Sequence, residues 1–236
     1  MSGGWVAKRF WKQATAEPVG AAFTVRLDGR AVKTPAKTLL EVPTLALAQE
    51  IAAEWDAQQG VIKPDAMPFT RMANSALDKV APQFAEVAGL IAAYGASDLI
   101  CYRANGPEKL LARQAAAWDP LLAWSASLLE APLITTAGVM HVEQPHASIA
   151  RLAAEVQACT PFQLAALHDL VMISGSLVGG LAVSRGWMDA QTLWDISRVD
   201  ERWQAELWGE DEEAAQSEGL RHAALIHAGR FYGLCG

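Results

Sequence analysis

The chain has 236 residues and a formal net charge of −7, with hydrophobic residues at 52% and charged residues at 19%. This composition is typical of a folded globular protein and excludes a disordered tail. The negative charge disfavours broad affinity for nucleic acids or anionic membranes, since both require a cationic surface. The cysteines Cys101, Cys159 and Cys235 form no CxxC pair. They therefore exclude a disulfide framework and a cysteine-based zinc site, and they suit a reducing compartment.

The first forty residues predict short β-strands. Phe23–Leu27 alternates apolar and polar residues, and Asp28–Gly29 is a strong two-residue hairpin signal. The return strand is expected at Arg30–Thr34, and a further short strand at Thr38–Val42. We expect a helix from Pro43 and Thr44 to about residue 59, with an apolar stripe that includes Trp55 on its buried side.

Beyond residue 64 the pattern is helical throughout. Helices are expected at 68–80, 82–94, 107–129, 145–158, 161–184, 189–207 and 211–232, with proline or glycine at most of the breaks. Strands followed by a run of helices indicate the α+β class with segregated parts. We predict a small β-rich N-terminal domain at residues 1–64 and a larger, all-helical domain at residues 65–236.

One predicted helix, Leu164–Val183, is apolar on nearly all sides and contains several small residues. A helix without a polar face must be surrounded by other helices, and small residues allow their backbones to approach closely. We interpret it as the central rod of the helical domain. The longest apolar run of the chain, Leu170–Ser184, is too short to cross a membrane.

Few residues of the sequence are candidates for a catalytic centre. Histidines occur at His141, His146, His168, His222 and His227, and the last two are five residues apart, which does not place them on one helical face. His168 with Asp169 is the best acid–base candidate, although a hydrogen-bonded structural histidine explains it more simply. We expect no catalytic residues, no metal and no cofactor. The alternative is a small-molecule-binding enzyme with His168 and Asp169 in a cleft.

Charge is divided along the chain. Residues 1–40 carry seven basic and two acidic residues, whereas residues 200–218 carry eight acidic residues and one arginine. Two interpretations stay open: solvated faces, or complementary patches that steer a charged partner.

Six stretches of the sequence, taken in order, resemble one protein family. They are Ala22–Ala36, Ala53–Gln58, Met67–Asn74, Asp98–Arg103, Trp118–Leu122 and Gln204–Gly209. The chain is similar over its whole length to the chaperones that bind the α subunit of F1-ATPase during ATP synthase assembly in mitochondria and some bacteria. The resemblance implies the same two-part fold and no ATP hydrolysis.

The resemblance also implies a client and a compartment. The expected client is the free F1 α subunit, whose exposed apolar surface is an aggregation hazard before the β subunit covers it. We expect no nucleic-acid partner, no membrane insertion and no stable incorporation into the mature complex. The N-terminus has no import sequence, so we expect a bacterial, cytoplasmic member, whereas organellar relatives act in the mitochondrial matrix. A permanent structural subunit of a larger complex is a further alternative.

The resemblance also suggests roles for particular residues. A structural role is expected for the family-motif residues Trp55, Asp56, Arg71 and Asn74. Partner binding is expected for Asp200, Glu201, Trp208 and Glu210. On the helix predicted at 189–207, an apolar stripe from Leu193 to Leu207 is expected to face inward.

Overall fold

A computed structural model of the chain describes residues 8–209 and 212–236. The described part divides into two compact units. Unit 1 comprises the residues up to Gln83 together with 161–165 and 230–236, and unit 2 comprises 84–160 and 166–229. Strands followed by many helices confirm the predicted α+β class.

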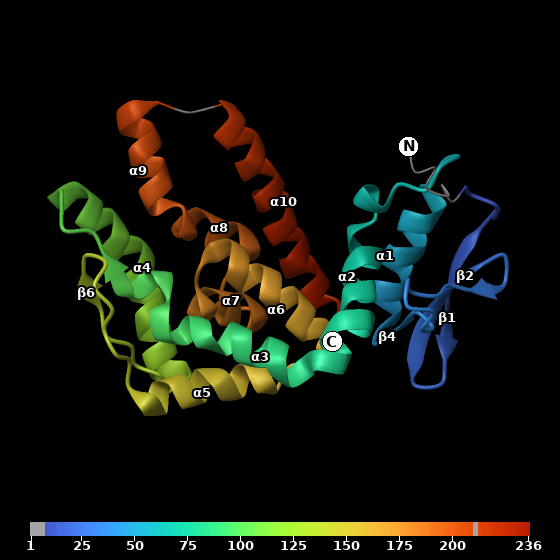
Figure 1. Ribbon diagram of the computed structural model, residues 1–236, viewed down its shortest axis with the longest axis horizontal. Helices are drawn as coiled ribbons and strands as arrows, with labels where there is room; N and C mark the ends of the chain where they lie inside the picture. Colours follow the sequence, from blue (N-terminus) through green and yellow to red (C-terminus); the bar gives the residue numbers. More distant parts are fainter. Residues whose placement is uncertain (1–7, 210–211) are drawn as a thin grey trace. The chain divides into compact units, whose positions relative to one another are not determined.

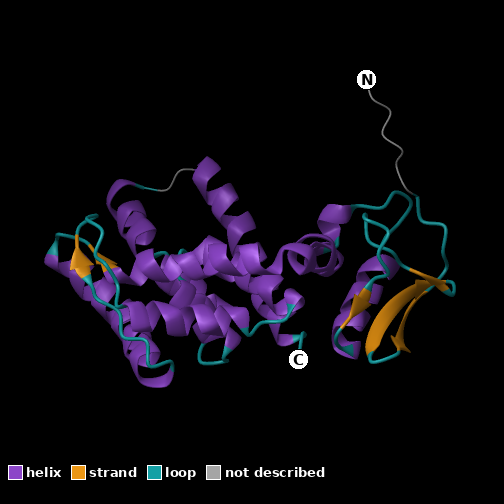
Figure 2. Ribbon diagram, turned by 60° about the horizontal axis from the view of Figure 1, so that its bottom comes forward, coloured by secondary structure: helices purple, strands orange, loops and turns teal. Residues whose placement is uncertain are grey.

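Unit 1 contains a small sheet covered by a helix. Its strands are β1 (Ala14–Val19), β2 (Ala22–Leu27), β3 (Arg30–Ala31) and β4 (Glu41–Val42). β2 pairs antiparallel with the other three, and its register with β1 runs from Ala14↔Leu27 to Val19↔Ala22. The predicted hairpin is present, because Asp28 and Gly29 both have positive φ between β2 and β3. Figure 2 shows these strands as one sheet beside a helix.

The covering helix is α1 (Leu45–Asp56), which packs against β1 and β2. Thr44 caps α1 by accepting a hydrogen bond from the Leu47 amide at 3.2 Å. α2 (Pro68–Ser75) follows and continues through a π-turn at Ala76–Val80 and a 3₁₀ turn at Ala81–Gln83. The buried face of α1 presents Leu47, Ala48 and Ile51 to the sheet, as its 3–4 residue spacing predicts.

The compact units divide after Gln83, whereas the sequence predicts a domain boundary between residues 64 and 65. The difference arises because α2 packs on α1 and belongs with the sheet. The end of the chain also joins unit 1. The Phe231 ring stacks on that of Phe69 with centroids 6.3 Å apart, and the Leu234 carbonyl accepts a hydrogen bond from Thr44.

Unit 2 is built mainly from helices. Their bounds are α3 (Phe84–Ala93), α4 (Glu108–Leu128), α5 (His146–Gln157), α6 (Pro161–Ser174), α7 (Leu177–Ser184), α8 (Ala190–Ser197), α9 (Val199–Trp208) and α10 (Glu212–Gly233). The first residues of α6 and the end of α10 belong to unit 1. Two short strands, β5 (Tyr102–Arg103) and β6 (Thr136–Ala137), pair in parallel. α7 contacts α4, α5 and α8, and Figure 1 shows it enclosed by other helices of this unit.

The predicted single helix over 161–184 is wrong, because the chain breaks between α6 and α7. Gly175 adopts φ +77°, and its carbonyl accepts a hydrogen bond from the Leu99 amide at 3.1 Å. Ser176 then caps α7 by accepting from the Gly179 amide at 2.9 Å. Nevertheless, α7 is enclosed by other helices and closely approached by a neighbouring one, as expected. A Cβ on Gly180 would lie only 2.8 Å from a Val171 methyl carbon.

By length and composition alone, the helical run Pro68–Cys101 is apolar enough to cross a membrane. The run is not one continuous rod, because π- and 3₁₀-turns interrupt it between α2 and α3. Its residues also divide between the cores of the two compact units: Phe69 and Met72 are buried in unit 1, and Ile91 is buried in unit 2. Of the most apolar window in this run, 33% is buried within the structure, and core helices of globular proteins pass the same compositional test.

Candidate functional site

The segment Glu54–Gln58, at the end of α1, binds backbone groups of three other segments. The Glu54 carboxylate accepts hydrogen bonds from the amides of Phe69 and Thr70 at 2.7 and 2.8 Å, and so caps the first turn of α2. Burial raises the pKa of Glu54, while the hydrogen bonds from Thr70 oppose that change. Gln58 accepts from the Lys63 amide at 2.8 Å and thereby closes the loop between the two helices.

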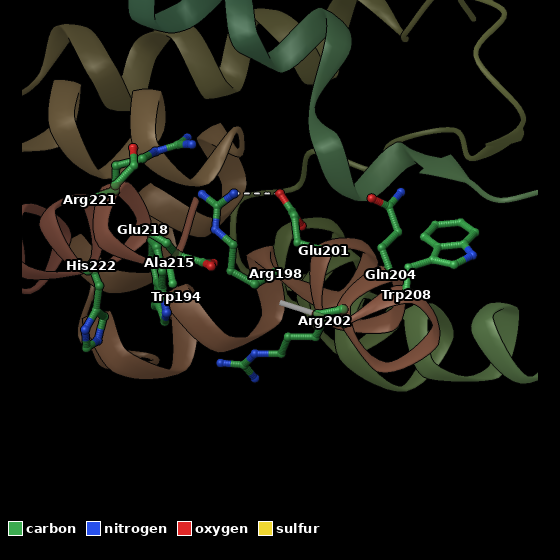
Figure 3. A pocket seen from close by; sticks show the side chains of 14 residues that line it. Trp194, Arg198, Glu201, Arg202, Gln204, Trp208, Ala215, Glu218, Arg221 and His222 are labelled. Carbon is green, nitrogen blue, oxygen red and sulfur yellow. Dashed lines mark hydrogen bonds and ion pairs between the residues drawn. The ribbon is translucent and has the colours of Figure 1, made fainter. Parts of the chain in front are cut away.

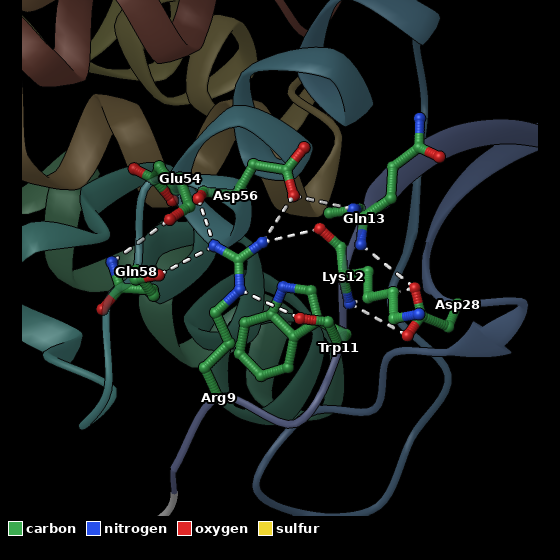
Figure 4. A network of polar contacts seen from close by, with 9 residues as sticks. Arg9, Trp11, Lys12, Gln13, Asp28, Glu54, Asp56 and Gln58 are labelled. Carbon is green, nitrogen blue, oxygen red and sulfur yellow. Dashed lines mark hydrogen bonds and ion pairs between the residues drawn. The ribbon is translucent and has the colours of Figure 1, made fainter.

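Asp56, in the same segment, ties the N-terminal part of the chain to α1. Its carboxylate accepts from the amide of Ala14, the first residue of β1, at 2.8 Å. Arg9 donates to the Gln58 carbonyl at 2.8 Å and to the Asp56 carbonyl at 2.5 Å (Figure 4). The Trp55 ring packs edge-on against Trp11 at 5.2 Å between centroids. These contacts join α1 to α2 and to β1, as a structural motif requires.

The other two residues of the predicted structural motif lie on α2. Arg71 is exposed and makes a 3.4 Å ion pair with Asp65, an arrangement that contributes little to stability. Asn74 is half-buried, and no hydrogen bond to its side-chain oxygen is found within the described residues. The geometry thus supports a structural role for Trp55 and Asp56 more directly than for Arg71 or Asn74.

Three of the four residues predicted to bind a partner, Asp200, Glu201 and Trp208, lie on α9. The predicted helix over 189–207 is broken at Arg198, so that α8 ends at Ser197 and α9 begins at Val199. None of the side chains of α9 is fully buried. Leu207 is 56% exposed and Trp208 is 77% exposed, so the expected inward stripe is wrong at Leu207. Glu210 lies outside the described residues.

The contacts of the Arg198 side chain explain why the helix breaks between α8 and α9. Its side chain is buried, its guanidinium lies 4.7 Å from the Trp194 ring centroid, and it donates to the Ile173 carbonyl at 2.5 Å. It also donates to Glu201 at 2.7 Å. The Glu201 side chain is half-exposed and holds this buried cation on its outer side. Arg198 therefore fixes the turn between α8 and α9.

Asp200 and Glu206 point from α9 toward α4. The Asp200 carboxylate accepts from the Gln114 side-chain amide at 2.6 Å, and Glu206 makes a 2.7 Å ion pair with Arg113. The hydrogen bond from Arg113 lowers the pKa of Glu206. The Arg113 guanidinium also lies 4.8 Å from the Trp203 ring centroid. Three of the acidic residues in the stretch 200–218 are thus bound within the chain, so the stretch presents less free negative charge than its composition suggests.

A groove of about 750 Å³ lies along α8, α9 and α10 in unit 2. We call it the α9 groove; its lining includes Trp194, Arg198, Glu201, Arg202, Trp208 and Arg221. Figure 3 shows Arg198 reaching Glu201 inside it, and Trp208 projecting from the end of α9. The groove joins arginine side chains to an exposed indole, and both residue types are enriched where proteins bind one another.

The structure places the remaining chemical candidates on the surface. His168 contacts Asp169 at 2.9 Å, and both side chains are more than a third exposed. Neither residue lines the α9 groove. The His222 ring packs on Trp194 and its Nε2 lies 2.7 Å from Gln191. Among the described residues, no group of three metal-ligating side chains converges.

Sequence reasoning missed Gln114 and Arg198. Gln114 is buried in α4 and meets Asp200, 86 positions further along the chain. A lone glutamine in a helical pattern gives no signal of such a contact. Arg198 could have been noticed as a charge beside the apolar positions of a predicted helix, which is a sign of a paired or stacked guanidinium.

Known proteins are similar to this chain in sequence and in fold. The family model described as ATP12 chaperone protein matches residues 8–126. The Schizosaccharomyces pombe protein described as "Protein atp12, mitochondrial" is 24% identical over 232 residues, which cover 91% of this chain and 79% of that protein. The crystal structure of Atp12 from Paracoccus denitrificans is 50% identical, covers 98% of this chain and 99% of its own, and superposes with a TM-score of 0.95. The Atu1473 protein from Agrobacterium tumefaciens is 40% identical over 96% of this chain and 85% of its own, with a TM-score of 0.90.

Proposed function

Because the chain belongs to the ATP12 chaperone family, we propose that it binds the free α subunit of F1-ATPase and prevents its aggregation before the α/β hexamer forms. The chain is then an assembly factor that is not stably incorporated into the mature ATP synthase. Its place of action is the compartment in which F1 assembles: the cytoplasm in bacteria and the matrix in mitochondria.

The observation that carries this proposal is the exposed end of α9. Leu207 and Trp208 expose apolar surface at the end of a helix whose other residues are largely polar. Exposed apolar side chains rimmed by charges are typical of sites that bind another protein. A chaperone also needs an interface weaker than the one that replaces it, and a single exposed helix is suited to this requirement.

The direct test is capture of purified F1 α subunit by the chain carrying Trp208→Ala. The indole is mostly exposed, so its removal leaves the fold intact and removes only contact with a partner. We expect capture to weaken by about tenfold or more, which is the effect of losing one interface hot spot. Leu90→Ala is the matched control, since Leu90 is 65% exposed on α3 and should leave capture unchanged.

A second test concerns charge on α9. Glu201→Lys reverses a groove-lining charge and should abolish capture, whereas Glu201→Gln keeps an oxygen that accepts from Arg198. Comparison of the two variants distinguishes an effect of the Glu201 charge on the partner from an effect of losing the hydrogen bond that Glu201 accepts from Arg198. Normal co-purification of the Glu201→Lys chain with the α subunit, together with normal capture by Trp208→Ala, would refute the proposed surface. Failure of the unaltered chain to capture the α subunit would refute the proposed client.

A further inference from the structure

A buried glutamine of α4 makes a hydrogen bond to α9. Gln114 lies in α4 with only 1% of its surface exposed, and its side chain forms two hydrogen bonds. The amide nitrogen donates to the Asp200 carboxylate at 2.6 Å, and the amide oxygen accepts from the Ala104 backbone amide at 2.9 Å. The orientation of the amide is determined, because a carboxylate accepts a hydrogen bond whereas a backbone N–H donates one.

Besides this hydrogen bond, α9 contacts α4 through Arg113, whose guanidinium lies 4.8 Å from the Trp203 ring centroid and pairs with Glu206. No side chain of α9 is fully buried, and Trp203 is half-buried. The Arg113–Glu206 ion pair joins two side chains that are each about half exposed, and such pairs contribute little to stability. A hydrogen bond from a buried donor to a charged acceptor contributes more, since loss of the acceptor leaves the buried donor unsatisfied.

We propose that Gln114 is a positioning residue for partner capture, which acts by holding Asp200 and, through it, the partner-binding face of α9. This inference rests on the proposed function. Gln114 itself is too deeply buried to touch a partner. Asp200 is half-buried, and one of its oxygens is committed to Gln114, so its first role is to fix α9 relative to α4.

Amide hydrogen exchange over residues 199–208 tests the positioning without any partner. We expect Gln114→Leu to accelerate exchange in α9 at least several-fold, and Asp200→Ala to do the same. The double variant should accelerate it no further than the larger single effect, since both substitutions remove one contact. Asp200→Asn keeps an oxygen that accepts from Gln114, and should leave exchange near that of the unaltered chain. Gln157→Leu, an exposed glutamine near the end of α5, is the matched control.

Capture of purified F1 α subunit tests the functional consequence. Gln114→Leu should weaken capture on the order of tenfold, which is the effect of losing one charge-assisted hydrogen bond, while Gln157→Leu should not change it. Unchanged exchange in α9, additive effects in the double variant, or normal capture by Gln114→Leu would each overturn the role of Gln114. Failure of the unaltered chain to capture the α subunit would instead refute the proposed client, and the exchange result would still stand.

Discussion

Asp98 should make the free energy of unfolding depend on pH, and one substitution should remove this contribution. Its carboxylate is completely buried and accepts a hydrogen bond from the Val178 amide at 2.9 Å, at the first turn of α7. Burial raises its pKa from 3.8 to about 6, against the hydrogen bonds from Val178 and Ser176, which lower it. The folded state therefore keeps the proton of Asp98 at a pH where the unfolded chain has already lost it.

The direction and size of the effect follow from this difference. Stability contributed by the protonated carboxyl is fully present below the unfolded pKa of 3.8 and is lost as the pH rises through about 6. A difference of about two pKa units corresponds to ~3 kcal/mol in the free energy of unfolding. Asp98→Asn cannot ionise, so any change that its amide causes in hydrogen bonding is the same at every pH.

Urea denaturation of both chains from pH 4 to pH 7 measures this contribution. The unfolding free energy of the unaltered chain, minus that of Asp98→Asn, should fall by roughly 2 kcal/mol over this range, because pH 4 already lies above the unfolded pKa of 3.8. Subtraction cancels the other titrating groups, which are common to both chains. Asp189→Asn serves as a comparison, since Asp189 is exposed and its pKa is lowered by the Thr192 amide that it caps. A difference curve for Asp98→Asn that is flat with pH would refute the reasoning.

Three further substitutions test packing by chemical denaturation. Trp55→Ala should lower the free energy of unfolding by about 2–3 kcal/mol. This is less than for a fully buried tryptophan, because Trp55 is only half-buried. A loss under ~1 kcal/mol would contradict the structural role of the segment Glu54–Gln58. Glu54→Ala leaves the first amides of α2 uncapped and should cost about 1–2 kcal/mol, with faster amide exchange at residues 69 and 70. Gly180→Ala places a methyl group 2.8 Å from a Val171 methyl and should cost about 1–3 kcal/mol, whereas the same change at Gly89, where nothing lies within 4 Å, should cost nothing or be slightly stabilising.

The sequence predicts those elements whose signals are local. α4 was expected at 107–129 and occupies Glu108–Leu128, since proline marks its start and apolar residues recur along it. The hairpin at Asp28–Gly29 was found because two residues suffice to specify it. β1 was not predicted as a separate strand, because its pattern is irregular and includes Pro18, and its pairing with β2 defines it.

Helix breaks and the contacts of the candidate site depend on residues that are distant in sequence. The turn at Gly175 requires positive φ, and its carbonyl is bound by Leu99, so the helical pattern around it gave no warning. Asp200 could be named as a candidate from the family resemblance, but its contact with Gln114 could not. Leu207 is likewise exposed, and the turn at Arg198 separates it from the stripe that begins on α8.

The return of the C-terminus to unit 1 has a consequence for synthesis on the ribosome. Phe231 is fully buried and stacks on Phe69, while Arg230 pairs with Glu50 at 3.0 Å. The sheet and α1 emerge first, yet residues 230–236 complete the core of unit 1. Unit 1 therefore reaches its final packing only after unit 2 has been synthesised, and a nascent chain halted before residue 230 would expose the apolar face of α2 to the solvent.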